Sequence, residues 1–339
     1  MLQLRVARIL ITGAAGFIGY HTSLRLFNNS SLDITTLDSL NPMLPTHLTA
    51  VRQSLLSDIG IRNEVVDLAT ESPLDLLNKL GEFEIVLHLA AFPGVRLSEA
   101  QGAQVLTNNN NSFENVAQYC QMTNAQLLYA SSSSIYGDQG MNGPCKEAST
   151  SIFTGKGAYS KSKWENERKA IALFNSNSLE SLGLRFFSVF GTHGRRDMAY
   201  YKFADQISNG LPLTIFDSLD DKRDYTPIEY IVDDIENLIS NILMDNGYIR
   251  DAIYGYDRLP ILNIGTGQPK SLRELIFIYE KYFGIPLEIV NSPRESMESK
   301  QTWSNNEKRN SLLPQRQLLE FSDMVNKFAH WHSTSGDAQ

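Results

Sequence analysis

Ile9-Leu10-Ile11-Thr12-Gly13-Ala14-Ala15-Gly16-Phe17-Ile18-Gly19 is the stretch that decides the fold. Its apolar beginning predicts a buried strand, and the residues after Gly19 begin an amphipathic helix. The glycines between them have distinct uses: Gly13 adopts a backbone angle that other residues disfavour, Gly16 lets a pyrophosphate approach the main chain, and Gly19 lets the helix lie close to the strand. The spacing GxxGxxG differs from the commoner GxGxxG of dinucleotide sites, so a turn that binds nothing stays open at this point.

The alternation of strand and helix patterns continues through the first half of the chain. Strands are predicted at 32–38, 64–68, 84–91 and 126–130, and helices at 49–56, 73–80, 107–119 and 159–174. Such alternation predicts an α/β fold with a doubly wound parallel sheet of Rossmann type.

Later elements predict a smaller mixed α/β lobe over the carboxyl ends of that sheet, where ligands bind in such folds. The elements predicted after residue 174, which are shared between this lobe and the large domain, are strands at 181–187, 213–216 and 262–265 and helices at 226–244, 271–283 and 322–332. We expect a cofactor domain at 1–185 with a returning segment at about 229–265. Residues 186–228 and 266–339 then form the substrate lobe.

The composition of the chain limits the kinds of molecule that it is expected to bind. The 339 residues carry 30 Lys and Arg against 38 Asp and Glu, a net charge of −8, which repels nucleic acid and anionic membranes. The two cysteines, Cys120 and Cys145, are too few for a disulfide framework and fit a reducing cytoplasm. No apolar run approaches the roughly 18 residues of a membrane span. We therefore expect a cytoplasmic protein that binds neither nucleic acid nor membrane, with no metal site.

Acidic residues at two strand ends indicate the cofactor. Asp38 follows Gly19 by 19 residues and ends the second predicted strand, where a carboxylate accepts hydrogen bonds from the adenosine ribose and repels the extra phosphate of NADP. NAD is therefore favoured. Asp67 ends the third strand, near the place of the adenine. His88, in the fourth strand, has no visible acidic partner, so we interpret it as a packing residue.

Tyr159 and Lys163 are four residues apart and share a face of a helix. An ammonium group beside a phenol lowers the pKa of the phenol, which would make Tyr159 a base for an alcohol or sugar hydroxyl. By itself so short a motif is weak, and it favours a surface pair over a catalytic one. The serines at 131–134, at the end of the fifth strand, could donate to the same hydroxyl, and together with the glycine turn they favour catalysis.

With these motifs the chain resembles the extended short-chain dehydrogenase/reductases that act as nucleotide-sugar epimerases and dehydratases, and most closely the UDP-glucuronate 4-epimerases. The resemblance runs through nearly the whole chain. Besides the glycine turn it rests on the segments His88–Ala91 with Gly94–Arg96, Tyr129–Gly137, Leu184–Gly191, Gly194–Ala199 and Lys222–Thr226.

The resemblance implies a role for each matching residue. The catalytic group would be Ser132, Ser133, Tyr159 and Lys163. NAD would be held by Gly13, Gly16, Phe17, Ile18, Gly19, Asp38, Asp67, Leu68, Leu89, Ala90, Ala91 and Asn108, with Tyr159 and Lys163. The UDP-sugar would be held by Arg96, Ser134, Arg185, Ser188, Arg195 and Arg223. Relatives often form dimers through helices matching 103–120 and 159–175, so a homodimer is expected.

Some positions depart from the family pattern. The proline before the catalytic tyrosine is absent, Arg196 replaces another proline, and 297–305 differ from the usual nucleotide-binding segment. Related dehydratases carry an Asp-Glu pair where this chain has Ser133 and Ser134, which are too weakly acidic or basic for elimination. We therefore expect 4-epimerisation of a UDP-sugar, most simply UDP-glucuronate.

Several alternatives stay open from the sequence. They are a UDP-glucose or UDP-N-acetylhexosamine 4-epimerase, a dehydratase or decarboxylase that takes an acid from the loop 138–147, and a non-catalytic NAD(P)-sensing scaffold on the same fold.

Overall fold

The computed structural model describes residues 6–40, 46–93, 99–216, 218–292 and 299–334. Its centre is a seven-stranded sheet in the order β10-β6-β5-β4-β1-β2-β3, in which every pairing is parallel. The strands are β1 (Ala7–Thr12), β2 (Leu32–Asp38), β3 (Arg62–Val65), β4 (Ile85–His88), β5 (Gln126–Ser132), β6 (Ser181–Phe186) and β10 (Ile261–Ile264). The predicted doubly wound parallel sheet is confirmed.

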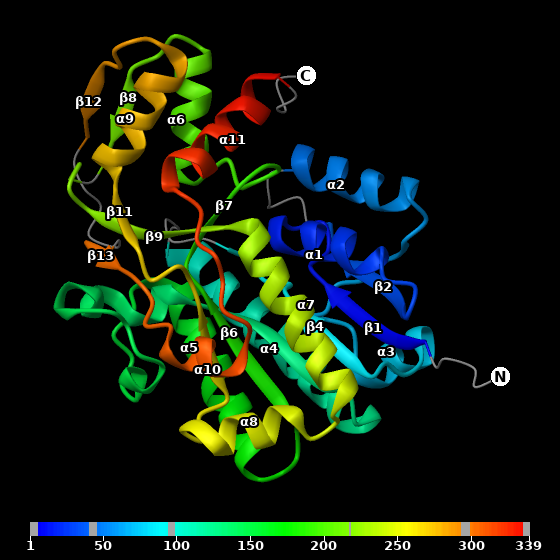
Figure 1. The fold of residues 1–339 in the computed structure, drawn as a ribbon. Helices are drawn as coiled ribbons and strands as arrows, with labels where there is room; N and C mark the ends of the chain where they lie inside the picture. Colours follow the sequence, from blue (N-terminus) through cyan, green and yellow to red (C-terminus); the bar gives the residue numbers. More distant parts are fainter. Residues whose placement is uncertain (1–5, 41–45, 94–98, 217, 293–298, 335–339) are drawn as a thin grey trace.

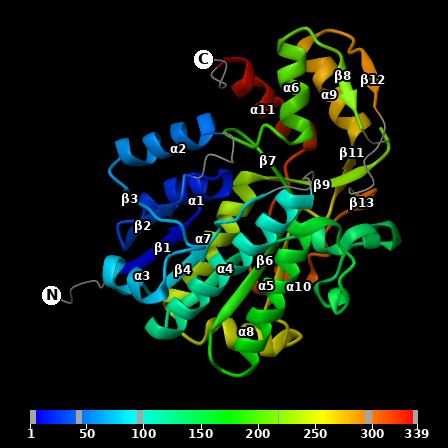
Figure 2. The same ribbon diagram turned by 180° about the vertical axis from the view of Figure 1, so that it is seen from behind.

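Helices cover both faces of this sheet (Figures 1 and 2). On one face lie α1 (Phe17–Phe27), α7 (Ile228–Met244) and α8 (Tyr248–Tyr256), which share an apolar core with β1, β4 and β6. On the other lie α3 (Pro73–Leu80), α4 (Glu99–Thr123) and α5 (Gly157–Asn175). The helix α2 (Thr46–Asp58) packs against α1. Among the described residues, none of the helices is long and apolar enough to cross a membrane.

A smaller lobe lies beyond the carboxyl ends of the strands (Figure 1). Its larger sheet pairs β9 (Lys222–Pro227) with β7 (Ser188–Phe190), β11 (Pro269–Ser271) and β13 (Gln301–Thr302), and its smaller one pairs β8 (Leu213–Ile215) with β12 (Ile289–Asn291). An aromatic-rich core joins α6 (Ala199–Ser208), α9 (Leu272–Phe283) and α11 (Phe321–Thr334). Short α10 (Glu307–Leu312) returns to β10 of the large sheet.

The division into domains stays a prediction. The part of it that concerns the returning segment can be compared with the strand pairing and helix packing. The strand β10, from the predicted returning segment, pairs with β6 at the edge of the large sheet. Both α7 and α8, from the same part of the chain, pack against the face shared with α1.

Most predicted elements differ from the observed ones at one or both ends, and three of these differences affect residues near the site. The third strand ends at Val65, so Asp67 lies in the turn that follows it. The fourth strand ends at His88 and leaves residues 89–91 as extended loop. The helix α4 is longer than predicted, and an asparagine inside it has backbone partners: Asn109 accepts from the N–H of Phe92 and donates to its C=O.

Ser271 begins α9 with a reciprocal capping box. Its hydroxyl accepts from the N–H of Glu274, and the Glu274 carboxylate accepts from the N–H of Ser271. We expect Ser271→Ala to lower the free energy of unfolding by about 1 kcal/mol, as is usual for a lost N-cap. Chemical denaturation measures this change. Ser333→Ala, in the exposed last turn of α11, serves as the control and should change stability by less than about 0.5 kcal/mol. Equal effects of the two changes would contradict the capping role.

Candidate active site

The turn between β1 and α1 has no room for side chains at its glycines. A Cβ on Gly13 would lie 2.6 Å from the Ala90 nitrogen, and one on Gly19 would lie 2.2 Å from the Gly13 carbonyl oxygen. Gly13 also has φ +72°, which favours glycine. Gly16 is the N-cap of α1, where no side chain caps the helix. The first-turn amides, with the positive end of the helix dipole, therefore suit a phosphate.

A hollow of about 590 Å³, partly open to solvent, runs from this turn along the ends of β2 and β4. It brings together nine residues predicted to hold the cofactor: Gly13, Gly16, Asp38, Asp67, Leu68, Leu89, Ala90, Ala91 and Asn108. Phe17, Ile18 and Gly19 do not line it and lie in the first turn of α1. A glycine cradle, apolar walls and an acid beside them fit the pyrophosphate and adenosine of NAD.

Six lining residues were not predicted: Leu37, Ser39, Thr49, Val66, Phe92 and Ser112. Most are chain neighbours of predicted residues. Ser112 follows Asn108 by four residues on α4, and this helical spacing could have indicated it. Thr49 lies on α2, which carried no such signal.

Asp38 is held in place by the same turn. Its carboxylate accepts from the N–H of Ala15 and from the N–H of Leu40, both at 3.0 Å. Burial raises the pKa of Asp38, and these two hydrogen bonds oppose the rise. The position agrees with the predicted contact to the ribose, which stays a prediction.

Ser132 and Tyr159 meet at the end of β5. Ser132 is a group that lowers the pKa of Tyr159, and Ser132 Oγ accepts from the N–H of Ser134 at 3.2 Å. Lys163 lies one turn further along α5, is buried, and donates from Nζ to the Ala130 carbonyl at 2.9 Å. Its Nζ is 5.8 Å from the centre of the Tyr159 ring.

The charge that acts on Tyr159 comes from another element. Burial raises the pKa of Tyr159, and the guanidinium of Arg195 lowers it, followed by the hydrogen bond from Ser132. We expected Lys163 to have this effect. Burial lowers the pKa of Lys163 to about 8, while the Glu167 carboxylate raises it. In the structure Arg195 is thus a cation that favours the phenolate, and the tuning of Tyr159 by Lys163 stays a prediction.

Arg185 requires a correction, because its side chain does not face a substrate. It is 1% exposed and forms an ion pair with Glu167 of α5 at 2.7 Å. Its remaining donors reach the Tyr136 hydroxyl, the Glu147 carbonyl and the Thr150 hydroxyl. With its hydrogen-bonding capacity engaged inside the protein, Arg185 is a structural residue.

The other predicted substrate residues have varied surroundings. Arg195 pairs with the Asp197 carboxylate, and Arg223 donates to the carbonyls of Lys222 and Lys300. Ser188 begins β7, Ser133 is buried, and the buried Ser134 Oγ has no hydrogen-bond partner in the described part of the chain. Arg96 lies outside the described residues.

His88 is a packing residue, as predicted. It is buried, its Nδ1 hydrogen-bonds the Thr12 hydroxyl at 2.8 Å, and its ring lies near Phe113. Burial lowers its pKa to about 3, so it is neutral at physiological pH. The described residues hold no group of three or more His, Cys, Asp or Glu placed to bind a metal ion.

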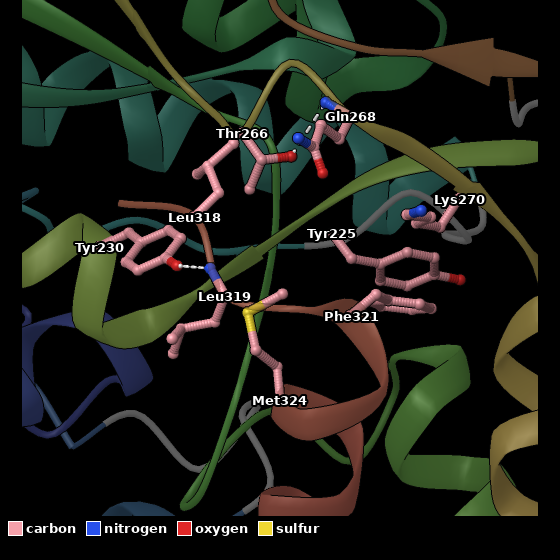
Figure 3. A pocket seen from close by; sticks show the side chains of 9 residues that line it. All are labelled: Tyr225, Tyr230, Thr266, Gln268, Lys270, Leu318, Leu319, Phe321 and Met324. Atoms are coloured by element: carbon pink, nitrogen blue, oxygen red, sulfur yellow. Dashed lines mark hydrogen bonds between the residues drawn. The ribbon is translucent and has the colours of Figure 1, made fainter. Parts of the chain in front are cut away.

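A second hollow, lined by Tyr230, Lys270, Met324 and their neighbours, contains none of the predicted site residues (Figure 3). Its polar groups hold the chain together: the Tyr230 hydroxyl accepts from the N–H of Leu319, and Lys270 pairs with Glu274. We interpret it as a junction between α7 and the segment that leads into α11.

Comparison with known proteins agrees with this site. Residues 9–241 match the model of the NAD dependent epimerase/dehydratase family. The chain belongs to this family. The predicted family and the NAD cofactor are confirmed.

Individual members of the epimerase/dehydratase family are similar over most of the chain. A probable UDP-glucuronate 4-epimerase of Rhizobium meliloti is 29% identical over 96% of each chain. UDP-glucuronate 4-epimerase 2 of Arabidopsis thaliana is 32% identical over 80% of this chain and 63% of its own. The crystal structure of a Bacillus cereus UDP-glucuronic acid 4-epimerase with UDP-glucuronic acid and NAD has a TM-score of 0.82 and 25% identity, covering 97% of this chain and 99% of that one.

The structural assignment of Arg185 can be tested by its removal. Arg185→Gln leaves the Glu167 carboxylate buried without its cation, and breaking a buried pair in this way costs about 3–5 kcal/mol. We expect a large fall in the denaturation midpoint. Arg25→Gln, at an exposed pair with Asp233 and Glu236 on α7, should cost less than about 1 kcal/mol. An Arg185 variant as stable as the Arg25 variant would contradict the correction.

Proposed function

We propose that this protein is an NAD-dependent UDP-sugar 4-epimerase that interconverts UDP-glucuronate and UDP-galacturonate. The observation that carries the proposal is the partly buried Tyr159, whose pKa is lowered by the guanidinium of Arg195 and by Ser132, in a chain whose first turn forms a dinucleotide cradle. The named activities of the Rhizobium and Arabidopsis relatives support this substrate.

The residues of the chain supply proton transfer and orientation. Tyr159, as the phenolate, takes the proton of the sugar O4, and the Ser132 hydroxyl orients that oxygen. Bound NAD supplies the hydride acceptor and donor at C4. The sugar passes through a 4-keto form, and Tyr159 returns the proton when C4 is reduced from the opposite face. Arg195 lowers the pKa of Tyr159 and so increases the fraction present as base.

Neutral hydroxyls near the end of β5 favour epimerisation over elimination. Ser133 and Ser134 can orient a carboxylate by donating to it, but neither can remove a C5 proton near neutral pH. The acids of the neighbouring loop are engaged elsewhere: Glu147 accepts from the N–H of Asn263, and Asp138 pairs with Lys156. Both carboxylates thus have partners within the protein, which favours neither of them as the second acid or base of a dehydratase.

The carboxylate of a uronate also needs cationic hydrogen-bond donors, or several neutral ones, once it is removed from water. Arg195, Ser133, Ser134 and Ser188 are the candidates among the described residues, and Arg223 is the candidate for the diphosphate. Formation of a homodimer through α4 and α5 and a cytoplasmic location stay predictions.

Replacement of Tyr159 tests the role of the base. Tyr159→Phe removes the hydroxyl alone, so we expect turnover to be abolished while bound NAD and folding persist. Ser132→Ala, which removes one positioned donor, should lower kcat by about a hundredfold. Conversion is measured by separation of the two UDP-sugars, and NAD by its absorbance after denaturation. Substantial activity of Tyr159→Phe would contradict the mechanism.

Comparison of substrates tests the specificity. We expect a higher kcat/KM for UDP-glucuronate than for UDP-glucose or UDP-N-acetylglucosamine, because hydroxyl and guanidinium donors otherwise remain unpaired. The three are compared at one pH with the same preparation. Preference for a neutral sugar would assign the protein to another group of epimerases, and turnover of none with full NAD content would favour the non-catalytic scaffold.

A further inference from the structure

Arg52 is a buried cation on α2 that contacts both halves of the molecule. Its side chain is 4% exposed. Nη1 donates to the Ala15 carbonyl at 3.1 Å, and Nη2 donates to the carbonyls of His193 and Gly194 at 2.8 and 3.0 Å. Ala15 belongs to the glycine turn, and its N–H holds Asp38. One guanidinium thus ties the cofactor turn to a segment that begins 141 residues after Arg52 in the chain.

The segment that Arg52 holds leads directly into Arg195, and its backbone is unusual. His193 has φ +53°, a conformation that non-glycine residues rarely adopt. A Cβ on Gly194 would lie 1.9 Å from the Tyr200 hydroxyl oxygen, so this residue is held close to α6. Such a backbone persists where surrounding contacts over-determine it. Two consecutive carbonyls bound to one guanidinium provide such contacts.

We propose that Arg52 is a positioning residue that fixes the backbone of 192–194 and thereby holds Arg195 in the place from which its charge acts on Tyr159. The proposal rests on the proposed role of Tyr159 as the base. It assigns a function to α2, which carries no predicted site residue. It also explains why the cofactor turn and the cationic loop keep a fixed relation: the same side chain binds both.

The charges around Tyr159 allow an indirect effect of Arg52, through Arg195, to be distinguished from a direct effect of the Arg52 charge on Tyr159. The groups that act on Tyr159 are Arg195 and Ser132, with Lys163 facing its ring, and Arg52 is not among them. The charge of Arg52 acts instead on Asp38, Tyr20, His21 and Tyr200. Arg195 in turn is influenced by Asp197, Tyr159 and Tyr200. We therefore expect a change in the titration of Tyr159 on loss of Arg52 to arise from a change in the position of Arg195.

The experiment compares the holoenzyme with Arg52→Gln, Arg195→Gln and the double variant. Activity that needs the Tyr159 phenolate rises with pH. A higher pKa of Tyr159 therefore moves this rising limb of the pH profile of kcat/KM toward higher pH. We expect Arg195→Gln to move it by about one pH unit, as for loss of a nearby opposite charge. Arg52→Gln should shift it in the same direction, and the double variant should shift it no further than Arg195→Gln alone.

A second measurement does not depend on activity. Amide hydrogen exchange of the segment 191–198 should be faster in Arg52→Gln than in the unchanged protein. Arg52→Lys, which keeps the charge and part of the donor set, should restore part of the protection and of the pH profile. Arg250→Gln is the matched control: it removes a guanidinium that pairs with Glu180 at the far end of the sheet, and it should leave both readouts unchanged.

The outcomes separate this inference from the proposed function. Unchanged exchange at 191–198 in Arg52→Gln would overturn the positioning role whatever the activity. An unmoved pH limb in Arg52→Gln, with a moved limb in Arg195→Gln, would also overturn it, as would additive shifts in the double variant. Faster exchange at 191–198 in Arg52→Gln, together with full activity of Tyr159→Phe, would have two consequences. It would support Arg52 as the residue that fixes the backbone of 192–194, and it would refute Tyr159 as the base.

Discussion

The absence of a side chain at three positions of the first turn is the constraint on which the site depends. Gly13 lies against the backbone of residues 89 and 90, and Gly19 lies against the Gly13 carbonyl. Because strand, helix and the neighbouring strand end all meet there, the cradle cannot shift without moving the β1–β4 pairing. Asp38 and Arg52 are both attached to Ala15 within this turn, which therefore locates the acid of the cofactor site and the cation that reaches the second lobe.

Buried charges join the remaining parts around this centre. Arg185 and Glu167 connect β6 to α5, one turn beyond Lys163. Asp224, fully buried on β9, accepts from Thr266, Gly267 and Ser304, so one carboxylate ties three segments of the smaller lobe together. Burial of each carboxylate costs free energy, and specific hydrogen-bond donors offset that cost. The catalytic side chains thus sit on elements whose relative positions are fixed by polar contacts as well as by the apolar core.

Local patterns made much of this predictable. The glycine spacing, the strand-end acid and the pair Tyr159 and Lys163 each lie within one or two neighbouring elements, so the sequence itself carries their geometry. The parallel sheet followed from the alternation of strand and helix. The helix predicted at 271–283 likewise begins with Ser271, which is the N-cap of α9.

The rest depended on contacts that leave little trace in the sequence. Arg185 was interpreted as a substrate ligand because its strand leads into a family motif, and its partner Glu167 lies on another element. The position of Glu167 four residues after Lys163, on the same helix face, was the one available indication. Arg52 could not have been found, because its acceptors are backbone carbonyls, which any residue provides. The effect of Arg195 on Tyr159 similarly needs the fold to bring the two together.

The central claim is that Tyr159 and the neutral serines support transfer of hydride at C4 without removal of the C5 proton. Incubation with UDP-glucuronate in deuterated water, followed by NMR of the recovered sugars, tests it most directly. The account predicts UDP-galacturonate with no deuterium at C4 or C5, because the hydride returns to the sugar that gave it. Deuterium at C5, a 4-keto-6-deoxy product, or carbon dioxide as the main product would contradict it.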